Sequence, residues 1–497
     1  MINNTMGTIV IKKKNEAQLW VTSDDSGILM ELSEHFCFYA EGYKFIPSYR
    51  NKLWNGKIYL YNRQTHTLPY GLIDETIQFC NDRGYDYQLT DTENRFSFDS
   101  DFVNSLSLCV NGKEISPRDY QLKAFEYATE NQRAILLSPT GSGKSLIIYM
   151  LLRYFLSEEL NKKAIVIVPT TSLVEQMYKD FDDYSTLDDE FNVEDEVHRI
   201  YSGKEKNFEQ SIVITTWQSA IKLPLPWFEQ FGCVIGDEAH TFKAKSLTTI
   251  MNRLSNAELR IGTTGTIDGG QVNELTLIGN FGPIHKVIST KELIDSNTLA
   301  DLKIESLVIK YSDQERKEFG KKTYQEEITY IAEHEKRNNF ISNLALDLKG
   351  NSLVIYNLVK KHGEPLFKRI RDKAKGRNVF FVSGNVDAEE RERIRSITEK
   401  EKNAIIVASA GTFSTGINIR NLHNIIFASP TKSQIRVLQS IGRGLRKSDN
   451  GQGTVVYDIA DDLSWKKRKN YTLNHAVERV KIYNKEKFNY SIHEVPL

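Results

Sequence analysis

The sequence is poor in cysteine and contains no long apolar run. Its four cysteines, Cys37, Cys80, Cys109 and Cys233, lie far apart and form no Cys-x-x-Cys pair, which excludes a zinc ribbon and a dense disulfide framework. We therefore expect them to be reduced core residues. No run of about 18 apolar residues occurs, so no membrane-spanning helix is expected. The first residues lack the basic and apolar regions of a signal peptide, which predicts a cytoplasmic protein.

The sequence also lacks net charge. Its 65 basic and 65 acidic residues cancel, and 26% charged with 40% hydrophobic residues is typical of a globular protein rather than a disordered one. Any contact with nucleic acid must therefore come from local basic faces, because no net field steers the molecule toward phosphate. At about 150 residues per domain, the length predicts roughly three domains.

Two stretches alternate short aliphatic runs with longer amphipathic ones, which is typical of parallel strands connected by helices. The runs are 134–137, 164–168, 211–214 and 233–235 in the first stretch, and 352–356, 378–382, 404–407 and 424–427 in the second. Uninterrupted runs suit strands buried on both faces. We predict an α/β protein with two tandem parallel-sheet domains, at 111–300 and 301–464.

The two ends of the chain have a different character. Residues 1–110, with many aromatics between Phe36 and Tyr61, predict a small α+β domain. Residues 465–497 predict a basic helical tail, because the run 466–469 is basic and a helical pattern follows it. The residues expected on the buried face of that helix are Leu473, Ala476, Val477, Val480 and Tyr483.

A phosphate-binding loop is indicated where the run ending at Leu137 meets the sequence Ser-Pro-Thr-Gly-Ser-Gly-Lys-Ser at 138–145, followed by an apolar helical stretch. Glycines let backbone N–H groups approach phosphate oxygens, and the helix start adds partial positive charge. Lys144 would neutralise the β- and γ-phosphates of ATP, and Ser145 would hold Mg²⁺. The other expected nucleotide contacts are Thr140, Gly141, Ser142 and Gly143. Ser138 stands where the usual pattern has glycine, so an ordinary glycine turn is the alternative.

Two adjacent carboxylates, Asp237 and Glu238, follow the aliphatic run 233–235. Asp237 fits a Mg²⁺ ligand and Glu238 fits the group that activates the attacking water in hydrolysis of a γ-phosphate. A solvated surface turn is the alternative for such a pair in isolation. Together with the glycine loop, the pair favours a nucleotide hydrolase.

Residues 237–240, Asp-Glu-Ala-His, resemble the DEAH form of motif II in superfamily 2 helicases, and other motifs of that superfamily follow in order. Residues 117–121 are similar to its adenine-recognition segment, with Gln121 as the adenine-pairing amide. Thr264, Gly265 and Thr266 resemble motif III, with glycine in place of the usual alanine. This resemblance implies that motif III and His240 couple the nucleotide site to the interface between two RecA-like domains.

Residues 439–446 resemble motif VI of the superfamily, in which Arg443 and Arg446 share one helix face. Permanently charged guanidinium groups suit a γ-phosphate whose charge grows in the transition state. Residues 414–418 resemble motif V, with Asn418 where many relatives carry aspartate. The resemblance implies nucleotide contacts by Gly416 and Gln439, and ATP clasped between two domains that open on hydrolysis.

The DNA strand is expected to lie across both α/β domains. By resemblance to motifs Ia, Ic, IVa and V, the contacting residues would be Pro169, Thr170, Thr171, Thr216, Trp217, Gln218, Ser383, Gly384 and Thr412. Small hydroxyl groups and free N–H groups contact phosphates without reading bases, so little sequence preference is expected. The alternative is that these threonines and serines only cap helices.

The segments 38–57, 322–327 and 486–490 resemble the recombination and repair helicases of T-even bacteriophages. This resemblance implies an ATP-dependent DNA helicase, using ATP and Mg²⁺ in the cytoplasm of an infected host, that acts on Holliday junctions, stalled forks, D-loops and R-loops with their RNA–DNA hybrids. It also implies phage recombination and single-strand-binding proteins as partners, and we expect a monomer. The alternatives are a DEAH-type RNA helicase and an ATP-switched annealing or clamp protein.

Basic and aromatic residues alternate in the segment 38–57. Its cations, Lys44, Arg50, Lys52 and Lys57, are candidates to grip backbone phosphates. The neighbouring Tyr43, Tyr49 and Trp54 are candidates to stack on unpaired bases. The alternative is that these aromatics form the core of a small domain.

Overall fold

The computed structural model describes residues 7–40, 42–90, 96–159, 161–238, 240, 245–267, 271–319, 322–384, 386, 388–412, 421–430, 441–442, 445 and 453–497. Its contacts divide the chain into two units, Met1–Ser138 with Gly143–Val287 and Pro139–Ser142 with Ile288–Leu497. Each unit contains one seven-stranded sheet. Within the described residues, no helix has the length and apolar character needed to span a membrane.

The N-terminal part of the first unit is a small α+β domain, as predicted. Its four-stranded sheet has the order β5-β2-β1-β6, in which β1 runs antiparallel to β2 and parallel to β6. Alternate residues of β1 and β2, such as Ile11 and Leu19, are fully buried, as expected for a sheet with one covered face. The elements are β1 (Ile9–Lys13), β2 (Gln18–Ser23), α1 (Ser26–His35), β3 (Cys37–Tyr39), η1 (Tyr43–Phe45), α2 (Pro47–Arg50), β4 (Lys57–Tyr59), β5 (Thr67–Pro69), η2 (Tyr70–Leu72), α3 (Ile73–Arg83) and β6 (Tyr87–Thr90).

This domain packs firmly on the α/β domain that follows it in the same unit. A Cβ atom at Gly71 would lie 1.9 Å from the carbonyl oxygen of Ile278 in α12, so only glycine permits this approach. Arg133 at the start of β9 forms an ion pair of 2.6 Å with Glu16 and lies over the Tyr70 ring, 3.9 Å from its centroid. The two parts therefore share one buried core.

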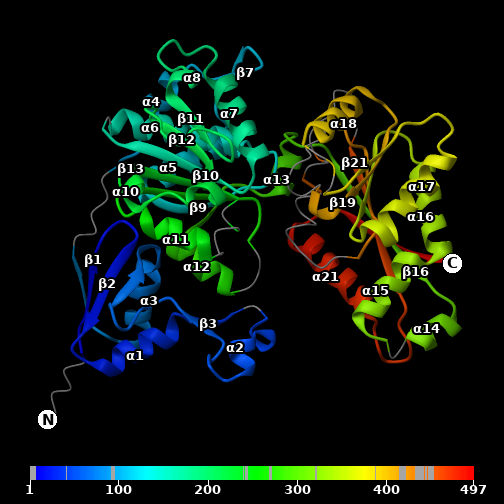
Figure 1. Ribbon diagram of the computed structural model, residues 1–497, viewed down its shortest axis with the longest axis horizontal. Helices are drawn as coiled ribbons and strands as arrows, with labels where there is room; N and C mark the ends of the chain where they lie inside the picture. The colour runs from blue at the N-terminus through cyan, green and yellow to red at the C-terminus, as the bar shows by residue number, and fades with distance from the viewer. Residues whose placement is uncertain are drawn as a thin grey trace. The chain divides into compact units, whose positions relative to one another are not determined.

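The first large sheet is entirely parallel, with the order β11-β12-β10-β13-β14-β9-β15. Helices cover both of its faces (Figure 1). Neighbouring residues of β9 point to opposite sides: Ile135 joins the core beneath α11 and α12, whereas Leu136 joins the core beneath α5, α6 and α7. Its strands are β9 (Arg133–Leu137), β10 (Lys163–Val168), β11 (Val197–Ile200), β12 (Ile212–Thr216), β13 (Phe231–Asp237), β14 (Leu259–Thr264) and β15 (Ile284–Lys286).

The remaining elements of the first unit connect or flank these strands. They are α4 (Ser100–Ser105), β7 (Cys109–Val110), β8 (Lys113–Glu114), α5 (Asp119–Asn131), α6 (Lys144–Glu158), α7 (Thr171–Ser185), α8 (Val193–Glu196), α9 (Trp217–Ala220), α10 (Leu225–Phe228), α11 (Lys245–Arg253) and α12 (Gln271–Phe281).

The second large sheet is also entirely parallel, with the order β18-β19-β17-β20-β21-β16-β22. Its strands are β16 (Leu302–Lys310), β17 (Ser352–Tyr356), β18 (Val379–Val382), β19 (Ile405–Ser409), β20 (Asn424–Phe427), β21 (Thr454–Asp462) and β22 (Tyr490–Pro496). The helices are α13 (Thr290–Asp295), α14 (Asp313–Phe319), α15 (Tyr324–Glu333), α16 (Glu335–Asp347), η4 (Val359–Gly363), α17 (Glu364–Lys373), α18 (Ala388–Lys400) and α21 (Tyr471–Lys485). Two tandem parallel-sheet domains are thus confirmed.

Each aliphatic run that predicted a strand matches one, although the runs 211–214, 378–382 and 404–407 begin one residue before their strands. The tail departs from its prediction in two ways. The chain ends in β22, which pairs with β16 and was not predicted. In α21, Val477 is 39% exposed rather than buried, and Arg479 lies inside instead. The helix is turned this way because Arg479 pairs with the buried Asp458 of β21. Among the cysteines, Cys37 is only half-buried, so its placement in the core was wrong.

Candidate active site

The phosphate loop connects β9 to α6, and two of its glycines have a backbone that other residues rarely adopt. Gly141 and Gly143 have φ angles of +86° and +80°. A Cβ atom at Gly143 would also lie 2.4 Å from Nε2 of Gln121. Within the loop, the Ser142 hydroxyl donates to the Pro139 carbonyl at 2.7 Å. The loop is therefore fixed in shape, with glycine required where the backbone turns.

The predicted cation and hydroxyl of the loop are both held by hydrogen bonds. The Lys144 ammonium donates to the Ser138 carbonyl at 3.1 Å, which keeps the charge at the loop. The Ser145 hydroxyl lies 2.8 Å from the Tyr184 hydroxyl of α7. Sequence reasoning missed Tyr184, because this partner comes from a separate helix 39 residues away.

Gln121, the predicted adenine contact, is a buried residue in the first turn of α5. Its side-chain oxygen accepts from the Arg118 backbone at 2.9 Å, and its amide donates to the Gly143 carbonyl at 3.4 Å. The side chain therefore connects the start of α5 to the phosphate loop, and its contact with adenine stays a prediction.

Asp237 ends β13, which lies beside β14 in the sheet. The carboxylate is 8% exposed and accepts a hydrogen bond of 2.7 Å from the Thr263 hydroxyl, a partner that motif reasoning missed. Burial first, and then the neighbouring charge of Glu238, raise the pKa of Asp237, while Lys144 and Thr263 oppose the shift. A nearby cation stabilises the ionised form of a buried acid whose pKa is raised, and this fits the prediction that Asp237 is a Mg²⁺ ligand.

Glu238 follows with a φ of +54°, an uncommon backbone for a residue other than glycine. Its Oε2 atom is buried and has no hydrogen-bond partner among the described residues. The Nδ1 atom of His240 lies 3.4 Å from it. An uncommon backbone and an unsatisfied buried oxygen at one residue suit contact with water or substrate.

The predicted coupling residues are joined by hydrogen bonds. The Nδ1 atom of His240 lies 3.1 Å from the Thr264 hydroxyl, which donates to the Thr266 carbonyl at 2.8 Å. Thr264 ends β14, and Gly265 lies in the turn between the two threonines. The structure therefore links the segment that resembles motif II directly to the segment that resembles motif III.

The first two predicted DNA-contacting segments lie side by side. They follow β10 and β12, which are neighbouring parallel strands, and the Gln218 amide donates to the Pro169 carbonyl at 3.3 Å. Three of their side chains also serve the fold: Thr170 caps α7, Thr216 is buried and donates to Ser219, and Trp217 packs against the core. Thr171 and Gln218 are the exposed members.

In the second unit, Ser383 and Thr412 follow the neighbouring strands β18 and β19. Both side chains are buried, and the Thr412 hydroxyl lies 2.7 Å from that of Ser409. Gly384 is exposed. The predicted residues Gly416, Gln439, Arg443 and Arg446 lie outside the described residues, so their roles stay predictions.

The cations of the N-terminal segment divide into two groups. Lys57 forms an ion pair of 2.6 Å with Glu34. Lys44, Arg50 and Lys52 are exposed and form no ion pair with another described residue. Their contact with phosphate stays a prediction, and these three side chains are the exposed ones among the four.

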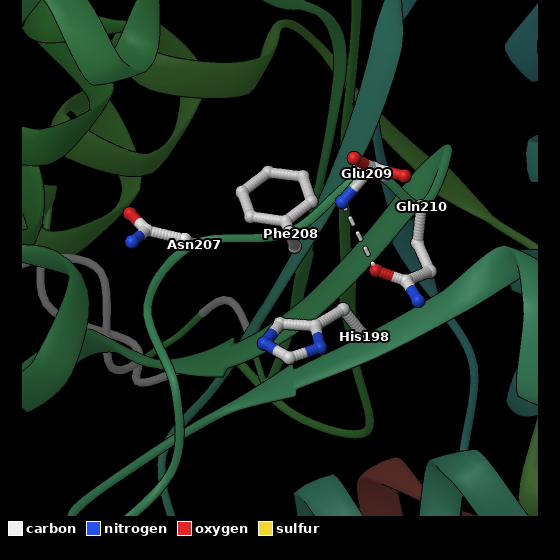
Figure 2. Close-up of a pocket in the computed structure, with 5 residues that line it drawn as sticks. All are labelled: His198, Asn207, Phe208, Glu209 and Gln210. Atoms are coloured by element: carbon white, nitrogen blue, oxygen red, sulfur yellow. Dashed lines mark hydrogen bonds between the residues drawn. The ribbon is translucent and has the colours of Figure 1, made fainter.

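A separate hollow of about 580 Å³ lies at β11, the edge strand of the first large sheet, and contains none of the predicted site residues. Figure 2 shows its lining residues, His198 and residues 207–210. The His198 and Phe208 rings are stacked with centroids 5.7 Å apart, and the Glu209 backbone donates to the Gln210 side chain at 3.2 Å. The polar groups that converge at the phosphate loop are absent from this lining.

Three protein families match successive parts of the chain. The N-terminal domain of DNA helicase UvsW matches residues 9–90, the res subunit of type III restriction enzymes matches 114–269, and the helicase conserved C-terminal domain matches 335–448.

Two relatives and one solved structure show the likeness over longer stretches. The ATP-dependent DNA helicase uvsW of Enterobacteria phage T4 is 37% identical over 492 residues, covering 94% of this chain and 95% of the relative. The crystal structure of T4 UvsW matches with a TM-score of 0.53 and 34% identity, covering 98% of this chain and 99% of that one. A DNA 3'-5' translocase of Sulfurisphaera tokodaii is 22% identical, covering 72% of this chain and 84% of the relative.

Proposed function

The chain belongs to the UvsW family of ATP-dependent DNA helicases, and from this premise we propose that it uses ATP hydrolysis to remodel branched DNA. The proposed substrates are Holliday junctions, stalled forks, D-loops and R-loops. The observation that carries the proposal is a likeness to phage T4 UvsW that spans 94% of the chain and includes the N-terminal domain. The likeness thus extends beyond the ATP-hydrolysing core that many helicases share.

The phosphate loop supplies the binding site for the triphosphate in this proposal. The helix α6 begins at Lys144, directly after the loop, and the partial positive charge of a helix N-terminus favours phosphate. Lys144 adds a full positive charge. To reach a γ-phosphate, its ammonium group must break its hydrogen bond to the Ser138 carbonyl. The ammonium thereby exchanges a neutral acceptor for an anionic one, which strengthens its hydrogen bond.

Asp237 and Ser145 are the residues that would hold Mg²⁺. When bound, Mg²⁺ neutralises charge on the β- and γ-phosphates. Thr263 orients the Asp237 carboxylate through its 2.7 Å hydrogen bond. Glu238, with its unsatisfied buried oxygen, is placed to accept a proton from the attacking water.

Movement of DNA requires that hydrolysis changes contacts elsewhere in the chain. We assign the first link to His240, which touches both Glu238 and Thr264. Loss of a γ-phosphate changes the charge beside Glu238, and the His240–Thr264 hydrogen bond carries this change to the end of β14. Arg443 and Arg446 are proposed to sense the γ-phosphate, and replacing each by alanine tests this through ATP hydrolysis.

The Lys144→Ala variant tests whether the protein is a motor. We expect its DNA-stimulated ATP hydrolysis to fall by about a thousandfold, because the developing phosphate charge loses its cation. Branch migration should stop with it. The Lys179→Ala variant, which removes an exposed lysine of α7, is the matched control and should keep both activities. A Lys144→Ala protein that still remodels junctions would instead be an ATP-switched clamp.

The substrate class is tested by ATP hydrolysis across a panel of nucleic acids of equal length. A four-way DNA junction and a DNA fork should stimulate hydrolysis more than linear duplex or single-stranded RNA. Stimulation by RNA that equals or exceeds stimulation by the junction would favour an RNA helicase and overturn the proposal.

A further inference from the structure

A row of polar contacts, here called the α6–α7 seam, joins the helix that begins at the phosphate loop to the end of α7. Ser145, Tyr149 and Arg153 follow one another at four-residue spacing in α6, so their side chains share one helix face. The Ser145 hydroxyl lies 2.8 Å from the Tyr184 hydroxyl in the last turn of α7. Further along, Arg153 donates to the Tyr149 hydroxyl at 2.7 Å and forms an ion pair with Asp188.

The seam holds the Tyr184 side chain at a defined place. Its ring packs beside the Tyr149 ring, with centroids 5.7 Å apart. The ion pair between Arg153 and Asp188 fastens the turn that follows α7, and both of its side chains are nearly buried. The guanidinium also lies over the Phe191 ring, 4.3 Å from its centroid. Charge-assisted hydrogen bonds are strong, so the end of α7 and the Tyr184 hydroxyl are fixed relative to Ser145.

The contact between Ser145 and Tyr184 matters because of what Ser145 is proposed to do. A serine hydroxyl has one hydrogen and two oxygen lone pairs. When its oxygen faces a cation, its hydrogen must point to another acceptor. The Tyr184 oxygen supplies one at 2.8 Å, an ordinary length for a hydrogen bond between hydroxyl groups.

The second proposed Mg²⁺ ligand, Asp237, has a partner of the same kind. Its carboxylate accepts from the Thr263 hydroxyl at 2.7 Å. Each of the two ligands is therefore held by a hydroxyl group from a neighbouring helix or strand. Partners behind a metal ligand set the direction of its lone pairs, and their loss usually weakens metal binding by about 10- to 100-fold.

We propose that Tyr184 is a positioning residue of the Mg²⁺ site. Its hydroxyl oxygen accepts the Ser145 hydrogen and thereby leaves a Ser145 lone pair directed to the ion. Tyr184 itself touches neither the ion nor the nucleotide. The inference rests on the proposed function, since it concerns the same ATP site. Its effect is confined to the part of nucleotide binding that needs Mg²⁺, because the loop and Lys144 contact phosphate without it.

The test measures affinity for a non-hydrolysable ATP analogue without DNA, once with Mg²⁺ and once with EDTA. Tyr184→Phe keeps the packed ring and removes the hydroxyl. We expect it to bind the analogue about tenfold more weakly with Mg²⁺ and equally well with EDTA. Tyr178→Phe is the matched control from the same helix and should behave as the natural protein. The Tyr178 ring packs on Arg199, and its hydroxyl has no hydrogen bond to another described residue.

A double-mutant cycle tests whether Tyr184 acts through Ser145. Ser145→Ala should lose most of the gain in affinity that Mg²⁺ provides, and adding Tyr184→Phe should cost nothing further. Additive losses would overturn the proposal, as would an equal loss with Mg²⁺ and with EDTA, which would mean that Tyr184 only shapes the loop. Unchanged or tighter binding by Tyr184→Phe would overturn it as well.

The Mg²⁺ dependence of ATP hydrolysis gives a second readout. For Tyr184→Phe, the Mg²⁺ concentration at half-maximal DNA-stimulated hydrolysis should rise about tenfold, while kcat at saturating Mg²⁺ stays nearly unchanged. The failure of this inference differs from that of the proposed function. A Mg²⁺ response that the natural protein and Tyr184→Phe share refutes only the role of Tyr184. A natural protein that binds the analogue equally with Mg²⁺ and with EDTA refutes the Mg²⁺ site together with this inference.

Discussion

The two large sheets have the same parallel architecture but treat buried aspartates differently. In the first sheet, Asp237 at the end of β13 has the neutral hydroxyl of Thr263 as its hydrogen-bond donor, and its pKa is raised by burial. In the second sheet, Asp458 and Asp461 of β21 pair with arginines, and all four side chains are 0–1% exposed. The first sheet thus gives its buried acid a neutral donor, whereas the second pairs its acids with buried arginines.

The second-sheet pairs belong to buried hydrogen-bond networks, in which the Arg337 Nη1 atom is the one guanidinium nitrogen of that residue without a partner among the described residues. Asp461 accepts from the Arg337 Nε and Nη2 atoms at 2.6 and 2.9 Å and from the Tyr311 hydroxyl at 2.9 Å. Asp458 accepts from Arg479 Nε at 2.8 Å and from the Tyr483 hydroxyl at 3.0 Å. These contacts fasten α16 and α21 to the sheet. A buried carboxylate in a parallel strand can therefore have a neutral partner or a cationic one. Removing the charge of the carboxylate should stabilise the fold in the first case and destabilise it in the second.

The largest effect is expected from breaking one structural pair. Arg337→Met should lower the free energy of unfolding by about 3–5 kcal/mol, because Asp461 is left buried with uncompensated charge. Denaturant unfolding measures this. The Arg337→Met/Asp461→Asn protein should recover much of the loss, since asparagine removes that charge and still accepts from Tyr311. No recovery would show that the guanidinium acts through its packing and its bond to the Ala428 carbonyl.

A smaller effect concerns His362, which is buried in the same region with Ser429 as hydrogen-bond partner at 2.9 Å. Burial, and next the charge of Arg337, lower the pKa of His362 to about 3. In the unfolded chain His362 binds a proton as the pH falls below about 6.5, whereas in the folded chain it stays neutral until about pH 3. Stability is therefore full above pH 6.5 and falls as the pH drops toward 3, by about 1.4 kcal/mol per pH unit.

His362→Gln should remove this part of the acid sensitivity, because glutamine does not titrate. Thermal unfolding between pH 7 and pH 5 measures the change in slope. Equal slopes for the natural protein and His362→Gln would contradict the assignment.

The smallest expected effect is a gain in the free energy of unfolding, on replacement of Asp237. Because the pKa of Asp237 is raised in the folded state, ionisation at neutral pH costs stability. Asp237→Asn should therefore raise the free energy of unfolding by about 1 kcal/mol at pH 7 while ATP hydrolysis is lost. Asp458→Asn is the matched comparison and should destabilise the fold. Destabilisation of both variants would mean that Asp237 is structural too.

The aliphatic runs predicted strands correctly because burial on both faces leaves a clear signature. The same reasoning missed β14 and β21, whose sequences carry charge. Arg260 is buried in β14 and donates to the carbonyls of Met251, Leu254 and Asn280. The aspartates of β21 meet arginines from distant helices. Charges neutralised by tertiary contacts are invisible to hydrophobic periodicity.

The motifs located the phosphate loop and the end of β13, and the sheet order then brings them together. Since β14 lies between β13 and β9, residues that follow these strands meet at one edge. Thr263 and Tyr184 escaped the sequence reasoning because a threonine and a tyrosine carry no motif of their own. In the N-terminal domain, composition indicated aromatics and cations but not which of them face solvent.

The close approach at Gly71 has a mechanical consequence. At Gly71 the backbone of the N-terminal domain packs directly against α12 of the ATP-binding layer. We therefore expect any displacement of that layer during the catalytic cycle to move the N-terminal domain with it. A Gly71→Ala substitution, which adds one methyl group at this contact, should separate the two domains, so that ATP hydrolysis continues while the N-terminal domain no longer follows the ATP-binding layer.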